Sequence, residues 1–190
     1  GSLAKLDISA ATTNAGTITV RTTLASTVAS TLTQGNGSRL NFAGTTAIAP
    51  TLDAATNSNT VDYCAAVSTQ LVKSTTYRDL SISQAGTTAL NVGGITVNGN
   101  LSVTGGTLSC SVNNYQITGN ATGTFTLAAG TTLALGATTG AAVVVFPTNF
   151  TTANISIDAT STVQYYANYS QVISSVPSQY GNLSIFTGTA

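Results

Sequence analysis

The stretch ITVNGNLSVTGGTLSCSVNNYQITGN, residues 95–120, contains the pattern that decides the fold. Apolar residues alternate with small polar ones in triplets such as 95–97 and 101–103. Glycine and asparagine follow each triplet, as expected for short β-strands joined by tight corners. The corner NGN at 98–100 recurs as TGN at 118–120. This period predicts a β-solenoid, in which each coil of about 20 residues buries its apolar face against the next coil.

The same apolar–polar–apolar triplet recurs along the whole chain at short intervals. Alternate side chains of a strand point to opposite faces, so each triplet places its two apolar residues on one face. Strand-forming residues are abundant, and Ser and Thr together make up 57 of the 190 residues. The chain is therefore predicted to be all-β, with these inward pairs: Leu6/Ile8, Ile18/Val20, Leu40/Phe42, Leu80/Ile82, Leu90/Val92, Ile95/Val97, Leu101/Val103, Phe125/Leu127, Leu133/Leu135, Ile155/Ile157, Val163/Tyr165 and Leu183/Ile185.

Two observations test this interpretation. Leu24, Val28 and Leu32 have a helical spacing, but their neighbours are Ala, Ser and Thr, so no helix is predicted. Repeated β-sandwiches would also have short strands at this spacing, but they usually carry charges outside, where this chain has Thr and Ser. We therefore expect one parallel β-helix, or β-solenoid, over residues 1–190, with about nine coils stacked over roughly 45 Å.

A longer repeat is superimposed on the short one. VDYCAAVSTQLVKSTTYRDLSI, residues 61–82, corresponds to VQYYANYSQVISSVPSQYGNLSI, residues 163–185. The repeating unit spans roughly 102 residues, which gives about 1.9 copies in the chain. The matched residues are Val61/Val163, Tyr63/Tyr165, Gln70/Gln171, Tyr77/Tyr180, Leu80/Leu183 and Ile82/Ile185. We expect Tyr63 and Tyr165 to occupy equivalent positions in the core, and likewise Leu80 and Leu183.

The composition excludes several classes of partner. Charged residues make up 5% of the chain, with five acidic and five basic side chains, so no basic patch is available for nucleic acid. No apolar run reaches the roughly 18 residues of a membrane span, and the longest, 141–146, has the length of a buried strand. A surface that depends on hydroxyls and amides for solubility is typical of extracellular β-proteins.

The two cysteines are predicted to be free. Cys64 shares the face of Asp62, which we expect to point outward, whereas Cys110 shares the apolar, inward face of Leu108 and Val112. Sulfur atoms on opposite faces of a strand layer cannot reach the spacing that a disulfide requires.

A β-helix can also carry polysaccharide lyase chemistry. Asp62, Lys73, Arg78 and Asp79 form the only charged cluster of the sequence, and a basic side chain there could act as the proton acceptor. The second motif lacks these charges, with Gln164, Ser175 or its neighbours, Gly181 and Asn182 in their place. We therefore interpret the cluster as solvent-facing corner residues, and we predict no enzyme and no catalytic residue.

No metal or cofactor is predicted either. The five aspartates (Asp7, Asp53, Asp62, Asp79 and Asp158) are scattered, histidine is absent, and no run has the spacing of a calcium loop. The glycine-rich stretches lack a phosphate-binding motif. Ice binding would require rows of outward threonines. At a spacing of about 20 residues, Thr96 and Asn98 are followed by Gln116 and Thr118, which breaks the row.

Residues 77–120 resemble the tandem repeats of giant cell-surface adhesins from Bacteroidetes-type bacteria. The resemblance covers about residues 40–190 and rests on five blocks in order: Tyr63, Gln70-Leu71, Tyr77–Ile82, Ile95–Leu108 and Thr124–Leu133. It implies a parallel β-helix related in architecture to filamentous haemagglutinin, exported to the cell surface by a route such as type IX secretion. The implied function is a non-catalytic stalk or adhesive filament. A carbohydrate-binding or polysaccharide-cleaving β-helix, and an ice-binding solenoid, are the alternatives.

The two ends are expected to contact further coils. Leu3, Leu6 and Ile8 near the start, and Leu183, Ile185 and Phe186 near the finish, have no polar cap beside them. We expect adjacent repeats or subunits stacked end to end as partners, and a surface polysaccharide as a further candidate partner.

Overall fold

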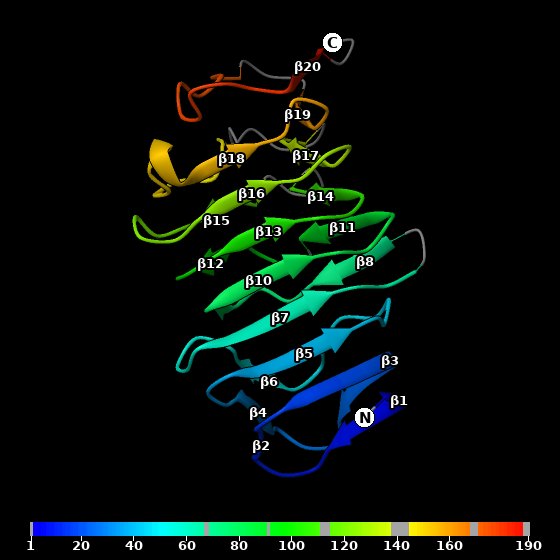
Figure 1. Ribbon diagram of the computed structural model, residues 1–190. Coiled ribbons are helices and arrows are strands. Elements are labelled where there is room, and N and C mark those ends of the chain that lie inside the picture. The colour runs from blue at the N-terminus through cyan, green and yellow to red at the C-terminus, as the bar shows by residue number, and fades with distance from the viewer. Residues whose placement is uncertain are drawn as a thin grey trace.

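The computed structural model describes residues 2–66, 69–90, 92–110, 115–137, 145–167 and 171–187. The chain winds around one axis, and coil stacks on coil from the N-terminal to the C-terminal strand (Figure 1). All pairings between the named strands are parallel, as a solenoid requires. The only helical segment among the described residues is the short 3-10 helix η1 (Thr152–Asn154). The prediction of an all-β parallel solenoid is confirmed.

The strands form three faces of the solenoid. The eight-stranded sheet contains, in order, β1 (Ser2–Ile8), β3 (Thr17–Ser26), β5 (Ser38–Phe42), β7 (Asn59–Tyr63), β10 (Asp79–Ile82), β13 (Leu101–Val103), β16 (Phe125–Leu127) and β18 (Ile155–Ile157). The six-stranded sheet contains β8 (Thr69–Val72), β11 (Thr87–Leu90), β14 (Thr107–Ser109), β17 (Thr132–Leu135), β19 (Thr162–Ala167) and β20 (Asn182–Thr187).

Two three-stranded sheets supply the third face. The first contains β2 (Thr12–Asn14), β4 (Thr31–Gln34) and β6 (Thr51–Asp53), and the second contains β9 (Thr76–Tyr77), β12 (Ile95–Val97) and β15 (Ile117–Thr118). A single bridge between Ala54 and Tyr77 continues the first sheet into the second. The six-stranded sheet starts at β8, so the described strands of earlier coils lie on two faces and those of later coils on three.

The core consists of side-chain columns that run along the axis. Parallel register places one residue of each triplet directly above its equivalent in the preceding coil. Burial of these apolar stacks is the main stabilising contribution to a repeat fold. Two columns line the eight-stranded sheet, and most of their members are fully buried: Ile18, Leu40, Val61, Leu80, Leu101, Phe125 and Ile155, and beside them Val20, Phe42, Tyr63, Ile82, Val103, Leu127 and Ile157.

The coils are less uniform than the predicted period. Val61 and Leu80 are neighbours in one column, and so are Phe125 and Ile155. The chain between Phe125 and Ile155 is more than half as long again as the chain between Val61 and Leu80. The described strands β16 and β18 nevertheless remain in register. The described residues therefore form about eight coils, as the eight-stranded sheet shows, and the expectation of nine was too high.

Two local predictions had different outcomes. Leu24 and Leu32 lie in β3 and β4 and are buried, while Val28 lies in the corner between them and is 54% exposed, so the segment is not helical, as predicted. Val92 was predicted to point inward with Leu90. This was wrong, because β11 ends at Leu90 and Val92 is 69% exposed in the following corner. The run 141–146 lies largely outside the described residues.

The first long motif contains a buried tyrosine pair. The hydroxyls of Tyr63 and Tyr77 are 3.0 Å apart and hydrogen-bonded to each other. The backbone N–H of Lys73 donates to the Tyr63 hydroxyl at 2.9 Å, and the Tyr77 hydroxyl donates to the Lys73 carbonyl at 2.6 Å. The two ring hydroxyls thereby form hydrogen bonds with the backbone N–H and the carbonyl of Lys73. This explains why tyrosine rather than phenylalanine occupies these positions.

The second motif repeats this arrangement. The hydroxyls of Tyr165 and Tyr180 are 3.3 Å apart, the Ser174 N–H donates to Tyr165 at 3.2 Å, and Tyr180 donates to the Ser174 carbonyl at 2.7 Å. Tyr63 and Tyr165 are both fully buried, which agrees with the expectation for this pair.

Strand pairing also matches between the motifs, but the sheets differ. Val61 and Tyr63 pair with Leu80 and Ile82 in the eight-stranded sheet. The corresponding pairs, Val163↔Leu183 and Tyr165↔Ile185, lie in the six-stranded sheet. The offset between the two motifs therefore moves the second one to another face of the solenoid. Leu183 and Ile185 are 41% and 55% exposed, so the expectation that they are buried like Leu80 and Ile82 was wrong: they lie in β20, the last strand of its sheet.

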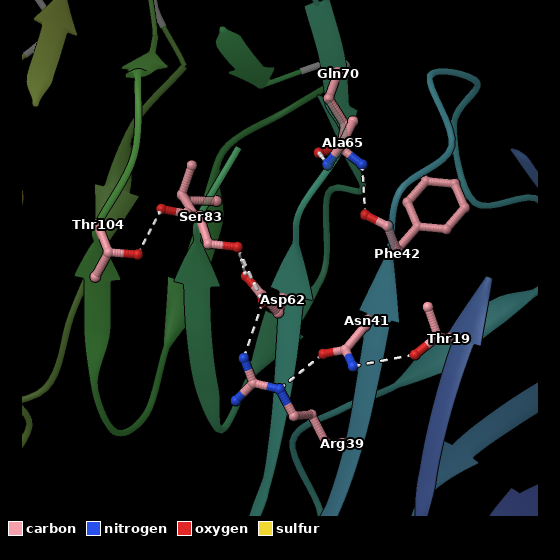
Figure 2. A network of polar contacts seen from close by, with 10 residues as sticks. Thr19, Arg39, Asn41, Phe42, Asp62, Ala65, Gln70, Ser83 and Thr104 are labelled. Carbon is pink, nitrogen blue, oxygen red and sulfur yellow. Dashed lines mark hydrogen bonds and ion pairs between the residues drawn. The ribbon is translucent and has the colours of Figure 1, made fainter. Parts of the chain in front are cut away.

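Gln70 and its match Gln171 also differ. Gln70 is fully buried, and its Nε2 donates to the carbonyls of Phe42 at 2.6 Å and Gly44 at 2.9 Å, while its Oε1 accepts from the Ala65 N–H at 3.3 Å. The bonds to Phe42 and Gly44 join β8 to the end of β5 in the preceding coil, and Figure 2 shows the one to Phe42. The buried amide atoms of Gln171 have no hydrogen-bond partner among the residues that the structure describes.

Replacing Tyr63 with phenylalanine is expected to lower the free energy of unfolding by about 1–3 kcal/mol. The substitution removes the acceptor of the Lys73 N–H and the partner of the Tyr77 hydroxyl, and both remain in the core. Urea denaturation followed by circular dichroism would measure the change. Tyr166→Phe, which removes the hydroxyl of a partly exposed residue, is the control. Equal midpoints for Tyr63→Phe and the unmodified protein would show that the pair does not stabilise the fold.

Candidate functional site

The structure does not assemble the four charged residues of the first motif into a site. Lys73 Nζ donates to the Ile48 carbonyl at 3.0 Å, and burial lowers the pKa of this amine. Arg78 Nη1 donates to the Asn98 carbonyl at 2.9 Å. Asp79 Oδ1 accepts the backbone N–H of residue 100 at 2.7 Å. Within the described part of the chain, no hydrogen bond or ion pair joins any two of the four, Asp62 included.

Asp62 belongs instead to a polar network on the outer face of the eight-stranded sheet (Figure 2). Its carboxylate accepts from Arg39 Nη2 at 2.9 Å and from the Ser83 hydroxyl at 2.9 and 3.0 Å. Arg39 Nε also donates to Asn41 Oδ1 at 2.7 Å, and Asn41 Nδ2 donates to the Thr19 hydroxyl at 3.2 Å. The network thus connects four successive coils.

This arrangement corrects the interpretation of Asp62 as a solvent-facing corner residue. Asp62 lies on the outer face but is only 5% exposed, because Arg39 and Ser83 cover it from the neighbouring coils. A charge that is shielded in this way must be paired and hydrogen-bonded. Its role is therefore to hold coils together, and the sequence pattern of a single strand could not show this.

Both cysteines are free, as predicted. Burial raises the pKa of the Cys110 thiol to about 12. Burial and then the nearby Asp62 charge raise the pKa of Cys64 to about 11. Both thiols are therefore protonated near neutral pH, and neither has the lowered pKa of a reactive nucleophile.

Clusters of metal ligands and long apolar helices do not occur in the described residues. These residues contain no group of three or more potential metal ligands of the His, Cys, Asp or Glu type. Over the same ranges, no helix has the length and hydrophobicity that a membrane span requires.

Rows of outward threonines run along two faces. On the six-stranded sheet, strand register aligns Thr69, Thr87, Thr107, Thr132 and Thr162 on five successive strands. On the third face, Thr96 pairs with Thr76 on one side and with Thr118 on the other. The expectation that Gln116 follows Thr96 was wrong, because this coil is slightly longer than the predicted period. The threonine row is therefore continuous over Thr76, Thr96 and Thr118.

A groove crosses the outer face of the six-stranded sheet. It has a volume of about 300 Å³ and is lined by Thr87, Thr107, Ser109, Ala134, Gln164 and Tyr166. The Tyr166 ring stacks on Phe186 of the neighbouring strand β20, with ring centroids 4.4 Å apart and an interplanar angle of 21°. We call this site the threonine-row groove, and none of its lining residues is charged.

Sequence reasoning did not find the threonine-row groove. A usable signal was present, because Thr87, Thr107, Thr132 and Thr162 each begin a strand. Aligning them requires the lengths of the intervening coils, and these lengths are unequal. The step from Thr132 to Thr162 is half as long again as the step from Thr87 to Thr107.

Comparison with known proteins gives no match to any protein family model, curated protein or solved structure.

Proposed function

We propose that this chain is a non-catalytic structural segment of a bacterial extracellular adhesin or surface filament. The observation that carries the proposal is the use of the outer polar side chains. They bond from coil to coil along the axis, as Arg39, Asp62 and Ser83 do, instead of converging on a reactive centre. An elongated scaffold with continuous side-chain columns suits a stalk that must resist extension.

Further contacts between coils support a structural role. Asn100 Oδ1 accepts from the Thr124 N–H at 3.1 Å and from its hydroxyl at 2.7 Å, in the following coil. Asn154 Nδ2 donates to the Ala121 carbonyl at 3.0 Å, again between coils. Such bonds occupy the polar corners and resist shear between neighbouring coils. The charge-poor, hydroxyl-rich surface is consistent with the proposed location on the cell surface.

The partners that we propose are adjacent repeats or subunits stacked end to end. The outermost strands, β1 and β20, each pair with one strand only among the described residues. Exposed apolar side chains lie on both of them: Leu3 is 42% exposed, Ile185 55% and Phe186 43%. An unpaired strand edge with apolar neighbours is a template for a further parallel strand. A contact between opposite ends is heterologous and therefore propagates into a filament.

Sedimentation velocity over a concentration series tests the end contacts. We expect the 190-residue chain to associate as its concentration rises, and Ile185→Lys to weaken this association about tenfold or more by placing a charge in the contact. Val92→Lys is the matched control, because Val92 is 69% exposed on a corner at the side of the solenoid. A monomer at all concentrations, or an equal effect of Val92→Lys, would contradict the proposed contact.

A separate assay addresses the non-catalytic assignment. Incubation with a panel of polysaccharides is expected to leave their viscosity unchanged. Depolymerisation that disappears in Lys73→Ala or Arg78→Ala would instead identify a polysaccharide-cleaving enzyme.

A further inference from the structure

We infer that the threonine-row groove binds an extended, uncharged polysaccharide along the solenoid axis. This inference goes beyond the structural role proposed above, because it assigns a ligand and a face to the chain. It rests on the shape of the groove, on the side chains that line it and on the aromatic pair at one end.

The shape favours a linear ligand. The lining residues come from four successive strands, β11, β14, β17 and β19. Neighbouring strands are about 4.8 Å apart, so the groove extends roughly 14 Å along the axis. Ser109 and Ala134 are small and only 4% and 6% exposed, so they form the floor of the groove. A polymer chain lying parallel to the axis would contact all four strands.

The chemistry favours a sugar. Hydroxyls of Thr87 and Thr107 and the amide of Gln164 can donate to and accept from sugar hydroxyls. Tyr166, stacked on Phe186, presents an aromatic surface of the kind that packs against the C–H face of a pyranose ring. Small-ligand sites usually combine an apolar surface with a few polar groups placed around it.

The charge pattern narrows the ligand class. None of the six lining residues is acidic or basic. A polysaccharide rich in uronate or sulfate groups would therefore find no cation in the lining to compensate its charge. We accordingly infer neutral glucans, mannans or related polymers rather than acidic ones.

Affinity electrophoresis in gels that contain xyloglucan, galactomannan or laminarin tests the inference, with polygalacturonate as the acidic polymer. At least one neutral polymer is expected to retard the protein, and polygalacturonate is not. Tyr166→Ala should weaken the binding about tenfold, because it removes the ring that faces the sugar. Tyr166→Phe should retain most of the binding, and Thr107→Val should weaken it while preserving the side-chain shape.

The control is Thr126→Val, which changes an outward threonine of β16 on the eight-stranded sheet. Circular dichroism and the urea midpoint of each variant separate loss of binding from loss of folding. Absence of retardation by every neutral polymer, or equal weakening by Thr126→Val, would overturn the inference. The inference would also be overturned if the unmodified protein bound no polymer but faceted growing ice crystals. The threonine row would then be an ice-binding face. None of these results bears on the end contacts, so the structural proposal would survive them.

Discussion

Raising the pH from about 9 to about 12 is expected to remove several kcal/mol of conformational stability. Burial raises the pKa of the Cys110 thiol from 9.0 to about 12 and that of the Tyr63 hydroxyl from 10.0 to about 12. Above pH 9 the unfolded chain therefore loses protons that the folded chain still holds. The contribution of these groups is fully present below pH 9 and is lost as the pH rises through 12.

The expected size follows from about 1.4 kcal/mol per pKa unit, which gives about 4 kcal/mol for Cys110 and about 3 kcal/mol for Tyr63. Urea titrations at successive pH values would measure how steeply the free energy of unfolding falls with pH. Cys110→Ala should flatten the slope between pH 9 and 12, and Tyr63→Phe should flatten it above pH 10. If Cys110→Ala retained the slope of the unmodified protein, the buried thiol would not be the titrating group.

The second large effect concerns the middle of the core. Phe125→Ala is expected to lower the free energy of unfolding by about 3–5 kcal/mol, through lost burial and the cavity that remains. Phe125 is fully buried, and its ring lies 5.4 Å from that of Phe146 and 5.9 Å from that of Phe150. Its column neighbours, one coil away on either side, are Leu101 and Ile155. Such a stack has little freedom to collapse into the cavity.

Urea denaturation followed by tyrosine fluorescence and by circular dichroism would measure this change. Thr126→Ala, at the next position of β16 and facing outward, is the control and should change the free energy of unfolding by no more than about 0.5 kcal/mol. Separate transitions for the two probes in Phe125→Ala would show that the coils on either side of the substitution unfold independently. Similar values for the two variants would contradict the assignment of Phe125 to a buried column of the eight-stranded sheet.

The inward face of most strands could be predicted from alternation alone. Leu40 and Phe42, or Leu101 and Val103, are separated by one polar residue, and strand geometry places such pairs on one face without reference to the rest of the chain. The same alternation failed at Val92, where a corner replaces the strand. It also failed for the burial of Leu183 and Ile185, which depends on a neighbouring coil and not on the strand itself.

The candidate site was less accessible to sequence reasoning. Asp62 was assigned to solvent because its own strand places it outward, but Arg39 and Ser83 reach it from other coils. The threonine-row groove depends on residues from Thr87 to Tyr166, and their alignment requires every intervening corner length. The two tyrosine pairs could be predicted in part. Their repetition was visible in the sequence, but the hydrogen bonds of the first pair to Lys73 and of the second pair to Ser174 were not.

The sequence by itself determined that this protein is a solenoid of short parallel strands, that its cysteines stay apart and that one motif occurs twice. The strands and the separate faces of the cysteines follow from local alternation and turn chemistry, which act within a few residues, and the repeated motif is visible by direct comparison of residues 61–82 with 163–185. Only the tertiary structure decided the register of the coils, and with it the rows of threonine, the Asp62 network and the placement of the second motif on another face. Register depends on the length of every corner, and corners of unequal length are tolerated because the hydrogen bonds between coils, not the period of the sequence, align the strands.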